Sequence, residues 1–142
     1  TIVVPKENKA GIQDFDDLKG KRISVQLGST SMTYAKSIEG AKVTTFASAG
    51  DAILNMLAGN ADAVINDKPV TDYLRSRNES IAENTLHLSP IATADQVAMV
   101  TTKENAKLND EMSAALKTLK ANGTFEKLHQ KWFGRPADPD LP

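Results

Sequence analysis

The sequence predicts an α/β fold in which a mostly parallel sheet is flanked by helices. Through the middle of the chain, a short strand pattern is followed by a helical pattern three times in succession. Parallel neighbours cannot be joined by a tight hairpin, so this alternation favours crossover helices. With 142 residues, 40% of them hydrophobic, the chain can bury one core and is too short for two independent domains. We therefore expect one globular unit.

The front of the chain predicts two strands. The β-branched run 1–4 ends at Pro5 and is typical of a strand. A polar loop follows, and then a short acidic turn that Gly20 ends. Residues 22–26 predict a second, buried strand, because most of their side chains are apolar or small.

Two further strand–helix pairs come next. A helix over about 31–39 leads to a half-buried strand over 42–46, in which apolar and polar side chains alternate. The run 50–58 carries apolar residues at helical spacing. A short apolar strand over 61–66 precedes a helix that opens at Asp67–Lys68–Pro69, with proline in its first turn.

The last third of the chain predicts one strand and two helices. Residues 97–100 are apolar and predict a strand. A helix that Asn122–Gly123 ends is predicted by apolar residues at i, i+4, i+8 and i+11, namely Leu108, Met112, Leu116 and Leu119. A shorter helix from Thr124 carries Phe125, Leu128 and Trp132 at i, i+3 and i+7. The tail from 134 has three prolines in nine residues and is expected to be irregular.

Composition excludes several classes of function. Seventeen basic and 18 acidic residues are interspersed, so no overall field attracts nucleic acid or an anionic membrane surface. The chain has no cysteine and therefore no disulfide, thiolate metal site or cysteine nucleophile, which leaves the compartment open. It has no apolar run of the roughly 20 residues that a membrane span needs and no signal segment at its front. Because it begins with Thr1, we expect a piece of a longer chain.

No residues predict catalysis or metal binding. The motifs HExxH, GxSxG and GxxxxGK[ST] are absent, and no spacing of acidic residues suggests a metal loop. His87 follows Leu86 in an apolar run, and His129 lies in the last predicted helix. Neither histidine has an acid or hydroxyl partner at a convincing place in the sequence, so we expect a surface or packing role for both.

The turn after the strand 22–26 predicts an anion site. Backbone N–H groups at a helix start have no intrahelical partner and lie at the positive end of the helix dipole. Gly28 allows close approach, and Ser29, Thr30 and Ser31 add hydroxyl donors. The alternative is an ordinary capped helix with nothing bound. Ligands of parallel sheets bind outside the carboxyl ends of strands, and Asn66–Asp67 ends another strand, so the two clusters face one crevice if both strands are central.

Four motifs occur in an order that a known family shares. They are DFDDLKGKRISVQLGSTSMTYAK, GNADAVINDKP, QVAMVTTKEN and LKTLKANGTFEKLHQKWFG. They resemble the second lobe and C-terminal return of the bacterial extracellular solute-binding proteins for polar amino acids, family 3, over residues 1 to about 134. In that family two α/β lobes, joined by two crossing strands, close on an amino acid that is delivered to an ABC importer.

The resemblance implies a domain organisation. The fold is expected to be a lobe of the periplasmic-binding-protein type II, with C-terminal helices that normally pack on the first lobe. Residues 1–5 and 96–100 would be the crossing strands, 6–95 the ligand-binding second lobe, 101–134 the C-terminal helical segment and 135–142 an irregular tail. The first lobe, which supplies an arginine for the ligand carboxylate and an aromatic floor in the family, is missing from this sequence.

The resemblance also implies roles for individual residues. Gly28, Ser29 and Thr30 match the position that holds the ligand α-carboxylate, and Asp67 matches the aspartate that pairs with the α-ammonium. Capping of the next helix is the alternative role of Asp67, and both roles can coexist. Gln26 and Asn66 stand where family members reach the ligand side chain, with Gln96 a weaker candidate.

Because Gln26 and Asn66 are both uncharged amides, the pocket floor favours glutamine, asparagine or another polar amino acid, although ordinary polar residues at strand ends are an equal alternative. Four arginines lie outside these motifs and are expected to be solvated; they are Arg22, Arg75, Arg77 and Arg135.

The implied function is binding of a polar L-amino acid, without a cofactor, for the permease subunits of an ABC importer in the periplasm or outside the cell. A ligand-sensing domain of a membrane receptor or kinase is the alternative, and a dehydratase of the same fold is a weaker one. The apolar face of the C-terminal helices exceeds what monomers usually expose. We therefore expect these helices either to fold back on their own lobe or to mediate self-association.

Overall fold

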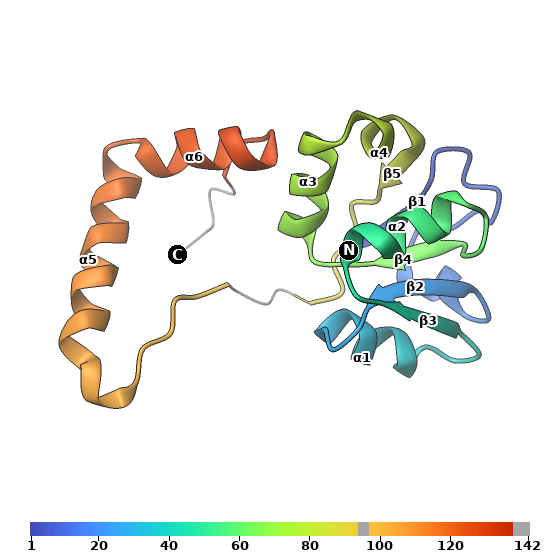
Figure 1. Cartoon of the computed structure of the whole chain (residues 1–142), viewed down its shortest axis with the longest axis horizontal. Coiled ribbons are helices and arrows are strands. Elements are labelled where there is room, and N and C mark those ends of the chain that lie inside the picture. Colours follow the sequence, from blue (N-terminus) through green and yellow to red (C-terminus); the bar gives the residue numbers. More distant parts are fainter. Residues whose placement is uncertain (94–96, 138–142) are drawn as a thin grey trace. The chain divides into compact units, whose positions relative to one another are not determined.

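The computed structural model describes residues 1–93 and 97–137. The chain divides into two compact units, Thr1–Thr93 and Ala94–Pro142 (Figure 1). The expectation of a single unit is therefore wrong, although only the first unit has buried hydrophobic clusters among the described residues. Buried hydrophobic side chains among the described residues lie in the first unit alone, in line with the expectation that a chain of this length buries one core.

A five-stranded sheet forms the centre of the first unit. Its strands are β1 (Ile2–Pro5), β2 (Arg22–Gln26), β3 (Lys42–Phe46), β4 (Ala63–Ile65) and β5 (Thr85–His87), in the order β3-β2-β4-β1-β5. β2 is parallel to β3 and to β4, whereas β1 is antiparallel to both of its neighbours. Four of the five strands therefore point the same way, which confirms the mostly parallel sheet, with β1 as the reversed strand inside it.

The helices predicted for the first unit form in the expected places, and one further helix is present. They are the short 3-10 helix η1 (Phe15–Leu18), α1 (Thr30–Ser37), α2 (Ala49–Leu57), α3 (Lys68–Arg77) and α4 (Glu79–Asn84). The helix α4 and the strand β5 were not predicted from the sequence. Each is six residues or shorter, and α4 buries Ile81 alone, so neither repeats its pattern often enough to show a period.

Side chains of the strands alternate between two apolar layers. Ile2 and Ile23 belong to one cluster, which also contains Leu18 of η1 and Ala35 of α1. Val3 belongs to the other cluster, which is formed with α2 and α4; its members are Val3, Ala52, Ile53, Met56, Ala61, Val64 and Ile81. Because successive strand residues face opposite sides, the sheet is covered by α1 on one face and by α2 on the other (Figure 1).

Arg22 was expected to be solvated, but it forms specific contacts in the structure. Its guanidinium forms two hydrogen bonds to Asp62, Nη2 to Oδ1 at 2.7 Å and Nε to Oδ2 at 3.2 Å, and a third to the carbonyl of Gly59. The pair ties the start of β2 to the turn before β4. Arg75 is also engaged, because its Nη1 donates to the carbonyl of Thr85 at 2.7 Å. Arg75 therefore ties α3 to the start of β5.

The Arg22–Asp62 pair predicts a component of acid sensitivity. The hydrogen bond from Arg22 holds the pKa of Asp62 below its usual 3.8. A carboxyl with a lowered pKa in the folded state stabilises the protein above its unfolded pKa, and this contribution is lost as the pH falls through the folded value. The urea midpoint of Asp62→Asn should therefore lie below that of the wild type above about pH 4, and the difference should shrink at lower pH. Asp16→Asn, at a carboxylate whose side chain is 96% exposed, should show no such trend.

The second unit contains η2 (Lys103–Asn105), α5 (Ala106–Ala121) and α6 (Thr124–Phe133). Gly123 has a φ of +77° between the two helices, so the predicted helix end is confirmed. Neither α5 nor α6 buries a residue. Their apolar stripe includes the exposed side chains Leu108, Leu119, Leu128 and Trp132.

The strand predicted over 97–100 does not form. These four residues have no regular secondary structure, and Val97 and Val100 are 91% and 90% exposed. An isolated apolar run becomes a strand only when another strand accepts its backbone hydrogen bonds, and residues 97–100 pair with none of the described residues. None of the helices within the described residues has the length and apolar character needed to cross a membrane.

Candidate functional site

Two predicted ligand segments lie side by side because their strands are neighbours. β2 pairs with β4 in parallel, with Ile23 opposite Ala63 and Ser24 opposite Val64. Continued by two residues, this register sets Gln26 beside Asn66. Neighbouring strands are about 4.8 Å apart, so the turn after β2 and the turn after β4 share one edge of the sheet. The turn at residues 28–31 and the pair Asn66–Asp67 therefore lie at the same edge, as expected if both strands are central.

The turn after β2 presents a row of unused donors. Among the described residues, the backbone N–H groups of residues 28–31 donate to no protein acceptor. They include the start of α1, where the helix dipole favours an anion. Gly28 has a φ of +75°, a conformation that glycine adopts without strain, and it is exposed. This arrangement can hold a carboxylate through backbone hydrogen bonds.

The hydroxyls of this turn contribute less than the sequence suggests. Ser29 Oγ donates to the carbonyl of Gln26 at 2.7 Å and accepts from the N–H of Met32 at 3.1 Å, so its hydrogen is already used in capping α1. Ser31 is only 8% exposed. Thr30 is exposed and has the remaining accessible hydroxyl. The anion site therefore consists of backbone N–H groups and one side-chain hydroxyl.

Asp67 occupies the N-cap position of α3 without capping it. Its side chain accepts no capping hydrogen bond, and it is exposed at the end of β4. The alternative role as a side-chain cap is therefore not realised in the structure. The carboxylate of Asp67 faces solvent at the same sheet edge as the free N–H groups.

The two amides differ in accessibility. Gln26 is half-buried, and its Nε2 makes one long contact of 3.5 Å with the carbonyl of Ala47. Asn66 is 5% exposed, and its Nδ2 donates to Thr71 Oγ1 at 3.2 Å. Gln26 can therefore turn toward a ligand, whereas the amide nitrogen of Asn66 is committed inside the protein. Gln96 lies outside the described residues.

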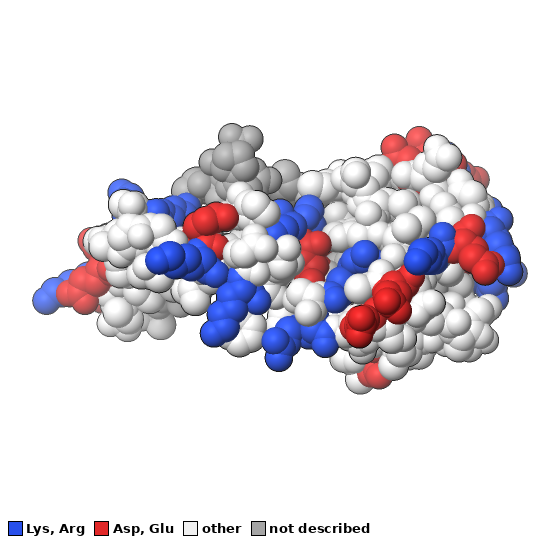
Figure 2. Space-filling view, turned by 90° about the horizontal axis from the view of Figure 1, so that it is seen from above, with Lys and Arg blue, Asp and Glu red and all other residues white. Residues whose placement is uncertain are grey.

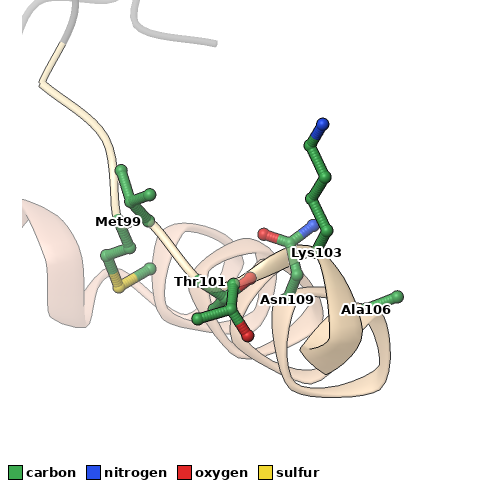
Figure 3. Close-up of a pocket in the computed structure, with 7 residues that line it drawn as sticks. Met99, Thr101, Lys103, Ala106 and Asn109 are labelled. Atoms are coloured by element: carbon green, nitrogen blue, oxygen red, sulfur yellow. The ribbon is translucent and has the colours of Figure 1, made fainter.

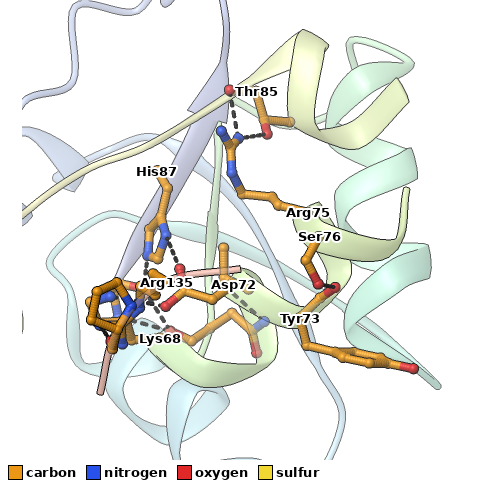
Figure 4. A network of polar contacts seen from close by, with 12 residues as sticks. Lys68, Asp72, Tyr73, Arg75, Ser76, Thr85, His87 and Arg135 are labelled. Atoms are coloured by element: carbon orange, nitrogen blue, oxygen red, sulfur yellow. Dashed lines mark hydrogen bonds and ion pairs between the residues drawn. The ribbon is translucent and has the colours of Figure 1, made fainter. Parts of the chain in front are cut away.

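The prediction that His87 lacks an acid or hydroxyl partner is wrong. Its Nδ1 lies 3.1 Å from Asp72 Oδ1, and its Nε2 lies 2.8 Å from Thr1 Oγ1. Lys68 Nζ donates to the other oxygen of Asp72 at 2.9 Å (Figure 4). Burial lowers the pKa of His87 below its usual 6.5, against the opposing effect of Asp72. Sequence spacing could not reveal these contacts, because Thr1 and His87 are 86 residues apart.

A shallow hollow of about 360 Å³ lies elsewhere, within the second unit (Figure 3). Its walls are Met99, Val100, Thr101, Thr102, Lys103, Ala106 and Asn109. None of these lining residues is acidic, so the hollow offers no carboxylate to pair with an ammonium group. Acidic and basic side chains are interspersed on the face drawn in Figure 2, as the near-zero net charge implies. The described residues contain no group of three His, Cys, Asp or Glu side chains that could hold a metal ion.

Comparison with known proteins identifies relatives for nearly the whole chain. The model of the bacterial extracellular solute-binding proteins, family 3, matches residues 1–135. The arginine-binding periplasmic protein of Mannheimia haemolytica is 35% identical over 86% of this chain and 52% of its own length. The chain thus spans about half the length of the curated relatives it matches.

Solved structures agree with this likeness. A mutant of ArgBP from T. maritima has a TM-score of 0.78 and 29% identity, over 94% of this chain and 57% of its own. An ancestral arginine-binding protein bound to glutamine has a TM-score of 0.74 and 32% identity, over 94% and 59%. With the same TM-score and identity, over 94% and 56%, the chain also resembles an ancestral amino-acid-binding protein described as a precursor of cyclohexadienyl dehydratase.

Proposed function

The chain belongs to the bacterial extracellular solute-binding proteins of family 3, and we propose that it binds a polar L-amino acid for uptake by an ABC importer. One observation carries this proposal: β2 and β4 are adjacent and parallel, so free backbone N–H groups and a free carboxylate lie at one edge. An amino acid carries the complementary pair of charges on one carbon. The N–H groups of the turn after β2 would hold its α-carboxylate, and Asp67 would hold its α-ammonium.

The proposed ligand is polar, and glutamine and arginine are the first two to test. Gln26 is the accessible amide at the edge and can both donate and accept a hydrogen bond. Relatives point to the same class, since one is named for arginine and an arginine-binding ancestor has been solved with glutamine. The committed amide nitrogen of Asn66 leaves Gln26 as the main side-chain contact from this sheet.

The proposed partners are the permease subunits of an importer, and the proposed location is the periplasm or the cell exterior. Relatives named as periplasmic or extracellular arginine-binding proteins support this location. A dehydratase reaction has less support, because the curated relatives are named as arginine-binding proteins and one solved relative is described as a precursor of a dehydratase.

Self-association through α5 and α6 is proposed from their exposed stripe. Leu108, Leu128 and Trp132 are each more than 40% exposed, and no residue of either helix is buried. Sedimentation velocity should therefore show a sedimentation coefficient that rises with protein concentration. Leu128→Glu should abolish this rise, because it places a charge in the stripe, whereas Lys127→Glu on the neighbouring exposed position should not. A wild type that stays monomeric at every concentration would contradict the proposal.

A thermal-shift panel tests the ligand proposal. If a complete two-lobed clamp binds at about micromolar, near −8 kcal/mol, half of its contacts would leave about −4 kcal/mol, a millimolar dissociation constant. At about ten times that constant, a ligand stabilises the fold by about 1.4 kcal/mol, a shift of several degrees. Among the twenty amino acids at about 10 mM, one or two polar ones should raise the melting temperature, and the others should leave it unchanged. A panel with no binder, repeated with the same result on a two-lobed form, would reject the proposal.

A further inference from the structure

A chain of hydrogen bonds links His87 to the residue before Asp67. His87 ends β5, and it contacts Asp72 of α3 through Nδ1 (Figure 4). Its Nε2 contacts the hydroxyl of Thr1. Thr1 Oγ1 also lies 3.2 Å from the carbonyl oxygen of Asn66, which directly precedes Asp67. The same carbonyl accepts the Thr1 amino group at 2.8 Å. The turn that carries Asp67, the proposed partner of the ligand ammonium, is therefore hydrogen-bonded at this carbonyl to Thr1, the residue before β1.

The hydroxyl of Thr1 has one hydrogen and two acceptors within reach. An ionised Asp72 only accepts, so the neutral imidazole of His87 keeps its hydrogen on Nδ1 and offers a lone pair at Nε2. The Thr1 hydroxyl then donates to Nε2, which at 2.8 Å is the shorter of its two contacts. When His87 takes up a proton, Nε2–H becomes the donor to Thr1 Oγ1. The hydroxyl hydrogen is then released to the carbonyl of Asn66.

Charged groups of three α3 residues surround His87, namely Asp72, Lys68 and Arg75, and the amino group of Thr1, the residue before β1, lies near it as well. The side chain of His87 is 12% exposed. Burial lowers its pKa most, the three positive groups lower it further, and Asp72 raises it. The exchange of donors is therefore expected at a pH below the usual histidine pKa of 6.5.

We propose that His87 is a positioning residue for Asp67: its protonation reverses the Thr1 hydroxyl and adds a hydrogen bond to the Asn66 carbonyl, at the turn that carries Asp67. The effect on a ligand rests on the function proposed above, whereas the reversal itself does not. In a binding-competent protein, amino-acid affinity should change across the titration of His87. Thr1→Val should remove this pH dependence, because valine keeps the branched shape and lacks the hydroxyl.

Nuclear magnetic resonance on the full chain tests the reversal directly. Across about pH 5 to 8, the ring nitrogens should show the Nδ1-protonated tautomer at high pH, and the Asn66 carbonyl carbon should shift with the midpoint of His87. Thr1→Val should abolish this shift and Thr1→Ser should retain it. His87→Gln should remove the inflection that belongs to His87.

Two results would overturn the inference. One is an Asn66 carbonyl that shows the same inflection in Thr1→Val as in the wild type. The other is a neutral His87 that carries its hydrogen on Nε2.

The ligand panel distinguishes this failure from that of the proposed function. If the chemical shift of the Asn66 carbonyl follows the titration of His87 but no amino acid binds, even to a two-lobed form, the reversal is supported and the proposed function is rejected. If an amino acid binds through Asp67 but the Asn66 carbonyl shift does not respond to pH, the function is supported and the reversal is rejected.

Discussion

Replacing Asp67 with asparagine is expected to weaken amino-acid binding by about 10- to 100-fold. A hydrogen bond between a carboxylate and an ammonium contributes about 1.5 to 3 kcal/mol, because both partners are charged. Asparagine keeps the shape and one acceptor oxygen but loses the charge. In the thermal-shift panel, stabilisation by about 10 mM of the best ligand should fall from about 1.4 to below about 0.4 kcal/mol.

A matched control separates the loss of a ligand contact from a general change of charge. Asp16 is also an exposed aspartate, in η1, with only a 3.8 Å contact to Lys19. Asp16→Asn should leave the ligand-induced shift unchanged. Both substitutions should leave the melting temperature without ligand nearly unchanged, since neither carboxylate is buried.

A ligand analogue makes the experiment specific for the ammonium. An analogue of the best ligand that lacks the α-amino group should bind the wild type about as weakly as the parent ligand binds Asp67→Asn. The substitution should then cost the analogue nothing further, because the contact is already absent. Equal losses for the parent ligand and the analogue would show that Asp67 acts on binding by another route, and the proposed ammonium contact would be rejected.

The local elements of the first unit follow closely from the sequence. Ser29 and Ser48 cap the helices that the apolar spacing predicts, and each helix begins within one or two residues of the expected place. The strands β2 and β3 are found over the predicted residues. These features depend on neighbours in sequence, such as a cap and the three residues after it, so the pattern alone is sufficient.

Long-range placement could not be read from the sequence. β1 looks like a separate entering strand, yet its residues Ile2, Val3 and Val4 are fully buried between β4 and β5. Its position depends on pairing with residues 61 to 84 positions away in the sequence, about which a short β-branched run carries no information. Its additional role as a crossing strand stays a prediction.

In the proposed site, too, the local features could be predicted from the sequence and the long-range contacts could not. The backbone N–H groups and Asp67 could be named from a strand end, a glycine and a helix start. The inward commitment of Asn66 and the partners of His87 could not, because each depends on a side chain brought in by another element. The pattern of β4 also does not indicate that Asn66 points inward, since all three residues of that short strand are buried.

Replacing Ile53 with alanine is expected to destabilise the first unit by about 2 to 5 kcal/mol. Ile53 of α2 is fully buried in the cluster that contains Val3, Val64 and Ile81, where the helix packs on the centre of the sheet. Truncation removes apolar contacts and leaves a cavity that rigid strands cannot fill. Against a total stability of about 5 to 15 kcal/mol, this loss leaves a marginal fold.

Leu54 is the matched control, because it is the next residue of α2 and is 56% exposed. Leu54→Ala should change stability by no more than about 0.5 kcal/mol. Urea unfolding should be followed separately in the two units, since Tyr34 and Tyr73 lie in the first and the single tryptophan, Trp132, lies in the second. A low urea midpoint for the tyrosine signal of Ile53→Ala, with an unchanged slope, is the expected result. Equal midpoints for the two variants would mean that α2 packs on the sheet through a different face. The edge that joins the turn after β2 to Asp67 would then lack the support that the structure assigns to it.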